Sequence, residues 1–163
     1  MSENYIVING KRAELTEEQL KKLGIEVSNN KRWRGNLHEK YYHVDTFNQV
    51  SSLQDINNGH DTWLYNSHNY FETAEEAEKY ARVLETEMLL RKYADKHNED
   101  MPWDGRCRHY FFYYNVPSNV VCIDYYTCSK EAREIYFSSG EIAKAAIEKI
   151  GEERIKEYLA YEW

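Results

Sequence analysis

The sequence contains few of the residues that build recognisable catalytic or metal-binding motifs. Among its three cysteines, Cys107, Cys122 and Cys128, and His109, no pair has the CxxC or HxxxH spacing typical of zinc sites. There is no glycine-rich phosphate loop, no GxSxG nucleophile motif and no DxD or ExxH pair. The apolar runs are too short to cross a membrane. These absences predict a protein that is not an enzyme, uses no cofactor or metal, and does not insert into membranes.

The charge balance is acidic. The 163 residues carry a formal net charge of −7, and residues 72–100 hold nine Asp and Glu against five Lys and Arg. Such a surface argues against nucleic-acid binding driven by phosphate contacts over the whole molecule. It favours a basic partner or simply good solubility. The odd cysteine count and the lack of an apolar amino-terminal segment predict a soluble protein of a reducing cytoplasm.

An internal repeat organises the chain. Residues 70–94 read YFETAEEAEKYARVLETEMLLRKYA, and residues 136–160 read YFSSGEIAKAAIEKIGEERIKEYLA. The alignment places Tyr70 on Tyr136 and Phe71 on Phe137, followed by Thr73 on Ser139, Glu75 on Glu141 and Ala77 on Ala143. Each copy follows an aromatic, strand-like region. The sequence therefore predicts a sheet-then-helix unit that is used twice.

Both copies have the signals of a helix start. Thr73 and Glu76 have capping-box spacing, and the apolar stripe that follows is Ala77, Ala81, Leu84 and Met88. In the second copy Ser138 and Glu141 have the same spacing, and the stripe is Ile142, Ala143, Ala146, Ile147 and Ile150. Gly151 is expected to end this helix. A last short helix is predicted over residues 152–161.

The regions before the helices favour antiparallel strands. Two or three antiparallel strands are predicted before the first helix: residues 41–47, 49–56 and, after a turn at 57–59, residues 61–66. Residues 108–116 and 119–127 predict a long hairpin, and a further strand is predicted at 133–137.

The amino-terminal segment is predicted to be a small hairpin and helix. Asn9-Gly10 lies between two β-prone runs, which is a strong hairpin signal, and Thr16 begins a capping box before a helix that Gly24 closes. The predicted fold class is α+β, with this appendage at residues 1–27. Two repeated units of antiparallel strands plus a helix follow, at residues 28–100 and 101–163.

Some polar residues invite a chemical interpretation. His43 with Asp45, and His60 with Asp61, are neighbouring acid and base groups, but neither pair has a nucleophile or ligand set that the sequence identifies. The densest basic cluster is formed by Lys31, Arg32, Trp33 and Arg34. Such a loop is a candidate for phosphate contact and base stacking, or is a generic basic loop.

Tyrosine is unusually frequent, with fifteen in the chain. Tyrosine suits binding surfaces, because it offers a large contact area with few rotatable bonds, and it equally suits strands. The candidate partner-binding residues are acidic residues of the first repeated helix and tyrosines of the long hairpin: Glu75, Glu78, Glu85, Glu87, Tyr113 and Tyr125.

Three stretches carry a resemblance to a family. These are the Thr-Glu-Glu-Gln-Leu start at Thr16, YFETAEEAE at residues 70–78, and IYFSSGEIAKAAIEKIGEERIKEYL at residues 135–159. Together they resemble small accessory proteins from phages of Gram-positive bacteria, over most of the chain except residues 28–65. The resemblance supplies no catalytic residue.

The family resemblance implies a role in evading host defence. Proteins of this kind include anti-CRISPR inhibitors that are compact, acidic and non-enzymatic. The leading hypothesis is an inhibitor of a host defence nuclease, such as a Cas effector, that acts by protein–protein interaction through an acidic, tyrosine-rich surface. The alternatives are a nucleic-acid-binding phage regulator that uses Lys31–Arg34, and a sponge for a nucleotide defence signal. The oligomeric state is open.

Overall fold

The computed structural model describes residues 5–8, 11–14, 32–132 and 134–161, and the chain divides into two compact units, Met1–Trp33 and Arg34–Trp163. In the first unit, strand β1 (Tyr5–Ile8) pairs antiparallel with β2 (Lys11–Glu14), so that Ile8 lies opposite Lys11. This pairing confirms the predicted hairpin. The predicted helix after Thr16 lies outside the described residues.

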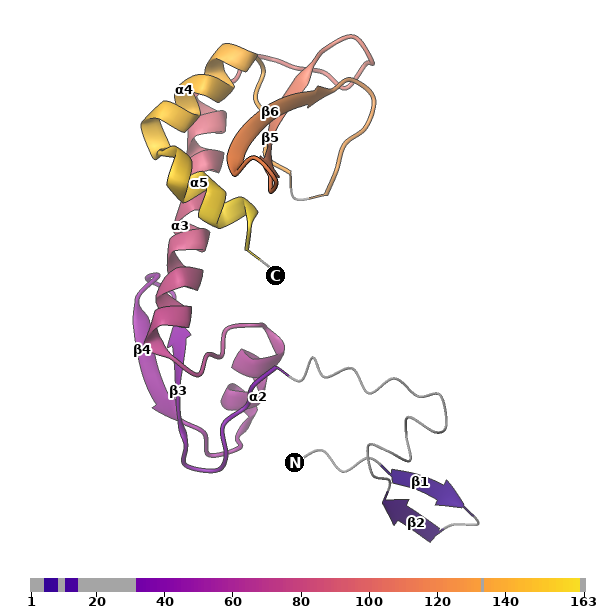
Figure 1. Ribbon diagram of the computed structural model, residues 1–163, viewed down its shortest axis with the longest axis vertical. Helices are drawn as coiled ribbons and strands as arrows, with labels where there is room; N and C mark the ends of the chain where they lie inside the picture. The colour runs from indigo at the N-terminus through magenta and orange to yellow at the C-terminus, as the bar shows by residue number, and fades with distance from the viewer. Residues whose placement is uncertain (1–4, 9–10, 15–31, 133, 162–163) are drawn as a thin grey trace. The chain divides into compact units, whose positions relative to one another are not determined.

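The second unit begins with two antiparallel strands, β3 (Lys40–Val44) and β4 (Val50–Gln54), shown in Figure 1. The turn between them is held by Asp45, whose Oδ1 accepts hydrogen bonds from the backbone N–H groups of Phe47 and Gln49 at 2.8 and 2.9 Å. Tyr42 and Val44 of β3 belong to the core beneath the sheet. Tyr41, which points to the opposite face of the strand, is fully buried as well.

Residues 61–66, predicted as a strand, are helical. They belong to helix α2 (Gly59–Asn66). The helix starts because Asn58 Oδ1 accepts a hydrogen bond from the Asp61 N–H at 2.9 Å, while Asp61 Oδ2 accepts one from the Asn58 N–H at 3.2 Å. This reciprocal cap satisfies two backbone donors that a helix otherwise leaves unpaired. The aromatic residues at this point suit a strand, but the cap decides the structure.

Helix α3 (Ala74–His97) starts at the predicted cap. Thr73 Oγ1 accepts from the Glu76 N–H, and Glu76 Oε2 accepts from the Thr73 N–H, each at 3.2 Å. The predicted apolar stripe holds only for the first half of the helix, because Met88 is 44% exposed. Leu90 is buried instead. Since Ala81 and Leu90 are nine positions apart at about 100° per residue, they lie on opposite sides of the helix.

The two sides of α3 serve two different cores. Ala77 and Ala81 pack with Val44 under the first hairpin, whereas Leu90 and Ala94 pack with residues of the second repeat. The helix changes its packing partner along its length. For this reason, an apolar stripe extended from Ala77 at helical spacing does not include Leu90. A single helix thus supports both repeats.

The second repeat contains the predicted long hairpin. Strand β5 (His109–Asn115) pairs antiparallel with β6 (Val120–Tyr126) in a regular register. The further strand predicted at 133–137 is reduced to one isolated bridge between Phe137 and Tyr110. This is a correction, since residues 134–136 form no strand.

Two short helices complete the second repeat. Helix α4 (Gly140–Ile150) is capped by Ser139, whose hydroxyl accepts from the Ile142 N–H at 3.2 Å. The predicted cap, Ser138, instead accepts a hydrogen bond from the Glu99 N–H at 3.0 Å. Gly151 has φ 103°, a value that favours glycine, and it ends α4 as predicted before α5 (Glu152–Leu159) begins.

The repeat has a matching backbone geometry in its two copies. Phe71 forms an antiparallel bridge with Tyr42 through two hydrogen bonds of 2.9 Å, and Phe137 forms one with Tyr110 through bonds of 2.9 and 2.7 Å. In each copy the helix cap follows two residues after the phenylalanine. The α+β fold with two strand-and-helix units is therefore confirmed.

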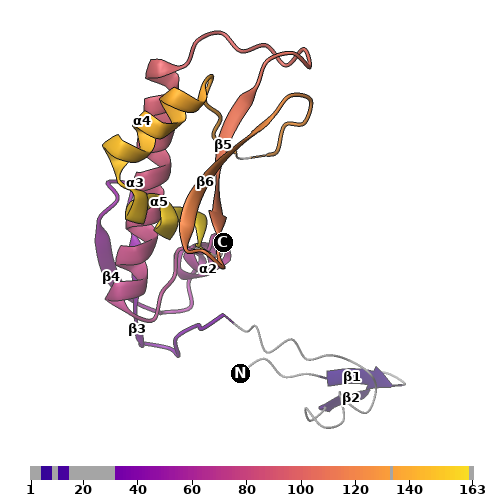
Figure 2. The ribbon, with the colours of Figure 1, turned by 45° about the horizontal axis from the view of Figure 1, so that its top comes forward.

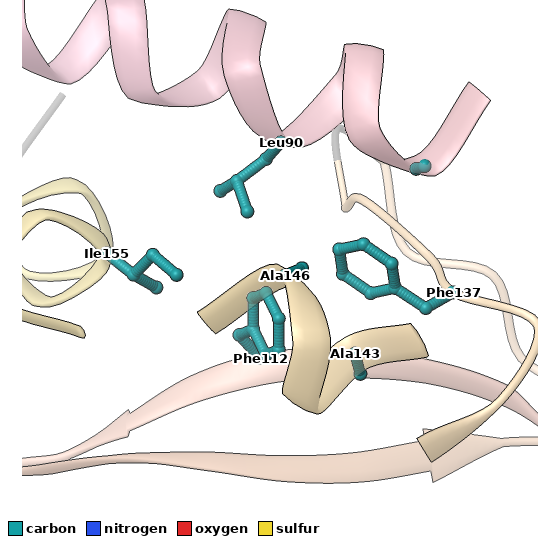
Figure 3. Close-up of a cluster of buried hydrophobic side chains, with 7 residues drawn as sticks. Leu90, Phe112, Phe137, Ala143, Ala146 and Ile155 are labelled. Atoms are coloured by element: carbon teal, nitrogen blue, oxygen red, sulfur yellow. The ribbon is translucent and has the colours of Figure 1, made fainter. Parts of the chain in front are cut away.

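The main core lies in the second repeat. Figure 2 shows α4 and α5 running alongside α3, with the β5–β6 hairpin on their other side. Figure 3 shows Leu90 of α3, Phe112 of β5 and Ile155 of α5 pointing toward the same space around α4. Ala143 and Ala146 are fully buried, because small side chains let α4 fit between its neighbours. Within the part of the chain that is described, no helix is both long and apolar enough to cross a membrane.

Candidate partner-binding site

A cavity of about 480 Å³ opens at the edge of the main core. It is lined by residues of α3, β5, the segment before the second helix cap, and α5: Glu87, Leu90, Phe112, Ala132, Glu134, Ile135, Tyr158 and Leu159. Leu90 and Phe112 are buried core residues, and Ile135, Tyr158 and Leu159 pack around them. The cavity is thus an uncovered part of the apolar core that also has two carboxylates in its wall.

The two carboxylates have different surroundings. Glu87 Oε1 accepts hydrogen bonds from Arg91 Nε at 2.9 Å and Nη2 at 2.7 Å, one turn further along α3. Glu134 forms no salt bridge with any residue in the described part of the chain. Burial, and then the nearby charge of Glu131, raise the pKa of Glu134. The wall of the cavity therefore contains a partly buried carboxylate that has no cationic partner among the described residues.

Tyr158 lies near both carboxylates. Burial, followed by the charge of Glu87, raises the pKa of its hydroxyl, so this group is a neutral hydrogen-bond donor and acceptor at physiological pH. A cavity with an apolar floor, one aromatic hydroxyl and a partly buried carboxylate fits a ligand that has an apolar stem and a cationic end.

The acidic residues predicted to bind a partner are not on one surface. Glu75 and Glu78 are exposed on the first turns of α3. Glu85 pairs with Arg154 Nη2 of α5. Glu87 points to the side of the cavity, because two residues along an α-helix correspond to a rotation of about 200°. Among these four, Glu87 alone lines the cavity, and the binding role of all four stays a prediction.

The two predicted tyrosines lie on opposite faces of the β5–β6 hairpin. Tyr113 is 41% exposed on the face that points away from the helices, opposite Cys122. Tyr125 is 42% exposed and pairs with Tyr110, whose ring packs toward α4. The Arg108 guanidinium lies 4.6 Å from the centre of the Tyr125 ring. The tyrosines therefore do not extend the cavity into one aromatic surface.

The basic cluster is partly used inside the fold. Lys31 lies outside the described residues, and Arg32 and Trp33 are half-buried. Arg34 Nε contacts Asp55 Oδ2 at 3.3 Å, and its Nη2 donates to Asn57 and Thr62 at 3.3 and 3.2 Å. Arg34 thus ties the chain to the start of α2, and a phosphate contact would compete with these bonds.

A buried polar network lies beside this arginine and was not recognised from the sequence. The rings of Tyr41 and Tyr70 stack at 4.0 Å. The Tyr41 hydroxyl donates to Asp61 Oδ1 and the Tyr70 hydroxyl to Asp55 Oδ2, each at 2.8 Å. Burial and these carboxylates raise the pKa of both tyrosines. Tyr70 heads the repeated sequence, which was the one available signal.

The carboxylates of the network are well supplied with donors. Burial alone would raise the pKa of Asp61, but hydrogen bonds from Tyr41, Asn58 and Ile56 outweigh it, so the pKa is lowered. Asp55 accepts from Asn57 N–H at 2.6 Å. Because each acid already has internal partners, the network fixes α2 against β3 and is a structural element.

The histidine and aspartate pairs noted in the sequence are not acid–base pairs in the structure. Asp45 holds the β3–β4 turn and Asp61 holds Tyr41, whereas the rings of His43 and His60 face each other edge-on at 6.4 Å. The three cysteines are free. Among the described residues, no three His, Cys, Asp or Glu side chains converge as a metal site.

His109 occupies an unusual position in β5. It is fully buried, and Trp103 stacks on its ring at 3.4 Å. Neither ring nitrogen has a hydrogen-bond partner of ordinary geometry within the described residues. Burial lowers the pKa of His109, against the smaller opposing effect of the Pro102 carbonyl, so the imidazole is neutral at physiological pH. It lies outside the cavity lining and acts as a core aromatic residue.

Comparison with known proteins adds no family or function to this geometry. No protein-family model, no curated protein and no solved structure matches the chain.

Proposed function

We propose that this chain is a non-enzymatic, phage-encoded binding protein that inhibits a host defence nuclease, such as a Cas effector, by covering its basic nucleic-acid channel. The observation that carries the proposal is the cavity with Glu134 in its wall. A partly buried carboxylate without a cation costs free energy, and that cost is offset when a cationic group of a partner enters. The occupant that fits is a lysine or arginine side chain of the partner protein.

In this mechanism, different residues determine the association rate and the dissociation rate. The chain has a formal net charge of −7, and the exposed Glu75 and Glu78 add negative potential at the start of α3. This field speeds encounter with a basic channel in a salt-dependent manner. The apolar stem of the partner's side chain then lies against Phe112 and Leu159, and its charged end reaches Glu134. Glu134 governs the dissociation rate in this scheme.

Binding should be linked to pH through the same carboxylate. The pKa of Glu134 is raised in the free protein, and an inserted cation would lower it again. Affinity should therefore increase as pH rises through the pKa of Glu134 in the free protein. A Glu134→Gln variant should lose this dependence, because the amide does not titrate.

The test is to measure whether the chain inhibits DNA cleavage by a purified Cas effector of the host, and to measure its binding kinetics to that effector by surface plasmon resonance. Glu134→Gln should increase the dissociation rate about tenfold or more, the range for a charge-assisted hydrogen bond. Glu75→Lys combined with Glu78→Lys should slow association and weaken its salt dependence. Glu99→Gln is the matched control, because its side chain is exposed and lies outside the cavity lining.

Two outcomes would contradict the proposal. One is an absence of inhibition and of any nuclease-resistant complex when the tagged chain is used as bait in host lysate. The other is inhibition that Glu134→Gln leaves unchanged, since the cavity would then play no part. Arg133 directly precedes Glu134 in the sequence, so Arg133→Ala tests whether this arginine competes with the partner's cation for Glu134. If it competes, the variant should bind the partner more tightly.

A further inference from the structure

A second hollow lies between α3 and α4, and its electrostatic character is opposite to that of the cavity. It is a groove of about 720 Å³. The residues that α3 contributes lie on one face of the helix, because they follow Leu89 at intervals of 3, 4, 7 and 8 residues. The lining residues are Leu89, Lys92, Tyr93, Lys96, His97, Ala145, Glu148, Lys149, Ile150 and Arg154. No residue of this groove lines the acidic cavity.

Four basic side chains from three helices meet in this groove. Arg154 of α5 is already held by Glu85 and by Thr86 Oγ1, the latter at 3.1 Å from its Nε. Lys92, Lys96 and Lys149 are exposed and form no salt bridge with any residue in the described part of the chain. Glu148 is the single carboxylate of the lining. The groove is therefore a local positive surface on an acidic protein.

Helix ends explain only part of this arrangement. Lys96 and Lys149 lie in the last turns of α3 and α4, where a cation is favourable beside the helix dipole. Lys92 lies more than one turn before the end of α3, and that effect falls off within the last turn. Gathering four basic side chains around a single carboxylate, Glu148, is unfavourable by itself. An anionic ligand would remove this repulsion.

The floor of the groove is apolar and partly aromatic. Tyr93 packs against the main core, and its ring stacks with the exposed His97 ring at 4.2 Å. Ala145 and Ile150 of α4 complete the apolar side. The hollow is within the size range of small-molecule sites, which favours a compact ligand with an anionic end and a flat ring.

We propose that this groove binds a nucleotide, with its phosphate groups at Lys92, Lys96 and Lys149 and its base against His97 and the apolar floor. Phosphate contacts from lysine supply the affinity, and stacking on an aromatic ring tolerates any base. The ligand is either a free nucleotide or the end of a single-stranded nucleic acid, since both present the same groups. The site is independent of the protein-binding role proposed above.

The experiment is titration of the full chain with ADP, inorganic phosphate, adenosine and an eight-residue oligothymidylate, followed by NMR and calorimetry at low salt. ADP should bind more tightly than either phosphate or adenosine, because it has both the anion and the ring. Binding of the oligonucleotide at least tenfold tighter than ADP assigns the site to a single strand, and equal or weaker binding assigns it to a free nucleotide.

Variants of the chain locate the site. Lys96→Ala and Lys149→Ala should each lower ADP affinity about tenfold, as expected for the loss of one charge-assisted contact. His97→Ala should weaken ADP but leave inorganic phosphate unchanged. Lys79→Ala is the matched control, an exposed lysine of α3 outside the groove. The proposal is overturned if neither ADP nor the oligonucleotide binds at millimolar concentration, or if the lysine variants bind like the wild type with an unchanged circular dichroism spectrum.

Discussion

Replacing Leu90 with alanine should weaken both repeats at once, because α3 belongs to both of their cores. Leu90 is 1% exposed in the core of the second repeat, and removing such a side chain typically costs ~2–5 kcal/mol. Leu90 also lines the cavity of about 480 Å³, so the new space joins an existing hollow. We therefore expect a loss of roughly 2–3 kcal/mol in the free energy of unfolding.

The structure provides matched reporters for this loss. The Tyr42 N–H bonds to Phe71 O in the first repeat, and the Tyr110 N–H bonds to Phe137 O in the second, each at 2.9 Å. If α3 couples the repeats, Leu90→Ala will speed hydrogen exchange at both amides by the same factor, roughly 30- to 140-fold.

Met88→Ala is the control on the same helix. Met88 is 44% exposed, so its replacement should change stability by less than about 0.5 kcal/mol. The reasoning is refuted if Leu90→Ala accelerates exchange at Tyr110 but leaves Tyr42 unchanged, since the first repeat would then be stable without the second.

Three further predictions concern buried titratable groups. Tyr41→Phe removes the hydroxyl that donates to Asp61 at 2.8 Å, so the free energy of unfolding measured with urea should fall by about 1–3 kcal/mol, and an unchanged value would contradict this. The lowered pKa of Asp61 provides stability that is lost on acidification below 3.8, so the stability of the variant should also depend less on acid pH. The pKa of His109 is lowered from 6.5, so the unfolded chain binds the extra proton and wild-type thermal stability should decrease as pH falls below 6.5; His109→Phe should flatten that decrease, and an identical pH profile would count against it. The pKa of Glu134 is raised from 4.5, so ionisation opposes folding as pH rises, and Glu134→Gln should melt at a higher temperature than the wild type at pH 7 but not at pH 4; equal melting temperatures at pH 7 would refute the stated burial cost.

The sequence predicts the repeat and the cap of α3 well, because these depend on local spacing, but it places the cap of α4 at Ser138, one residue before Ser139. The alignment of Phe71 with Phe137 appears as two equivalent bridges, and Thr73 and Gly151 start and end helices as expected. Helix α2 is not predicted, since its aromatic residues resemble a strand and the Asn58 cap depends on one side-chain contact. The predicted apolar stripe of α3 fails after Leu84, at Met88, because the helix changes its packing partner there.

The candidate site is predicted only in part, for a different reason. Glu87 is among the expected partner-binding residues, but Glu134 and Tyr158 are not. These three come from positions far apart in the chain, and only the packing of α5 against α3 and β5 brings them to one cavity. Spacing along the sequence contains no information of this kind. The basic groove escapes notice similarly, because Lys149 approaches Lys92 through helix packing.

The shared helix also determines how this molecule can be divided for experiments. A fragment that ends near residue 100 would keep α3 but lose the partners of Leu90 and Ala94, leaving an apolar stripe in water. A fragment that starts near residue 101 would lack the helix against which Phe137 and Ile155 pack. Both pieces are expected to associate or precipitate. Mixed together, they should recombine into one folded complex, which makes the chain suitable as a split reporter.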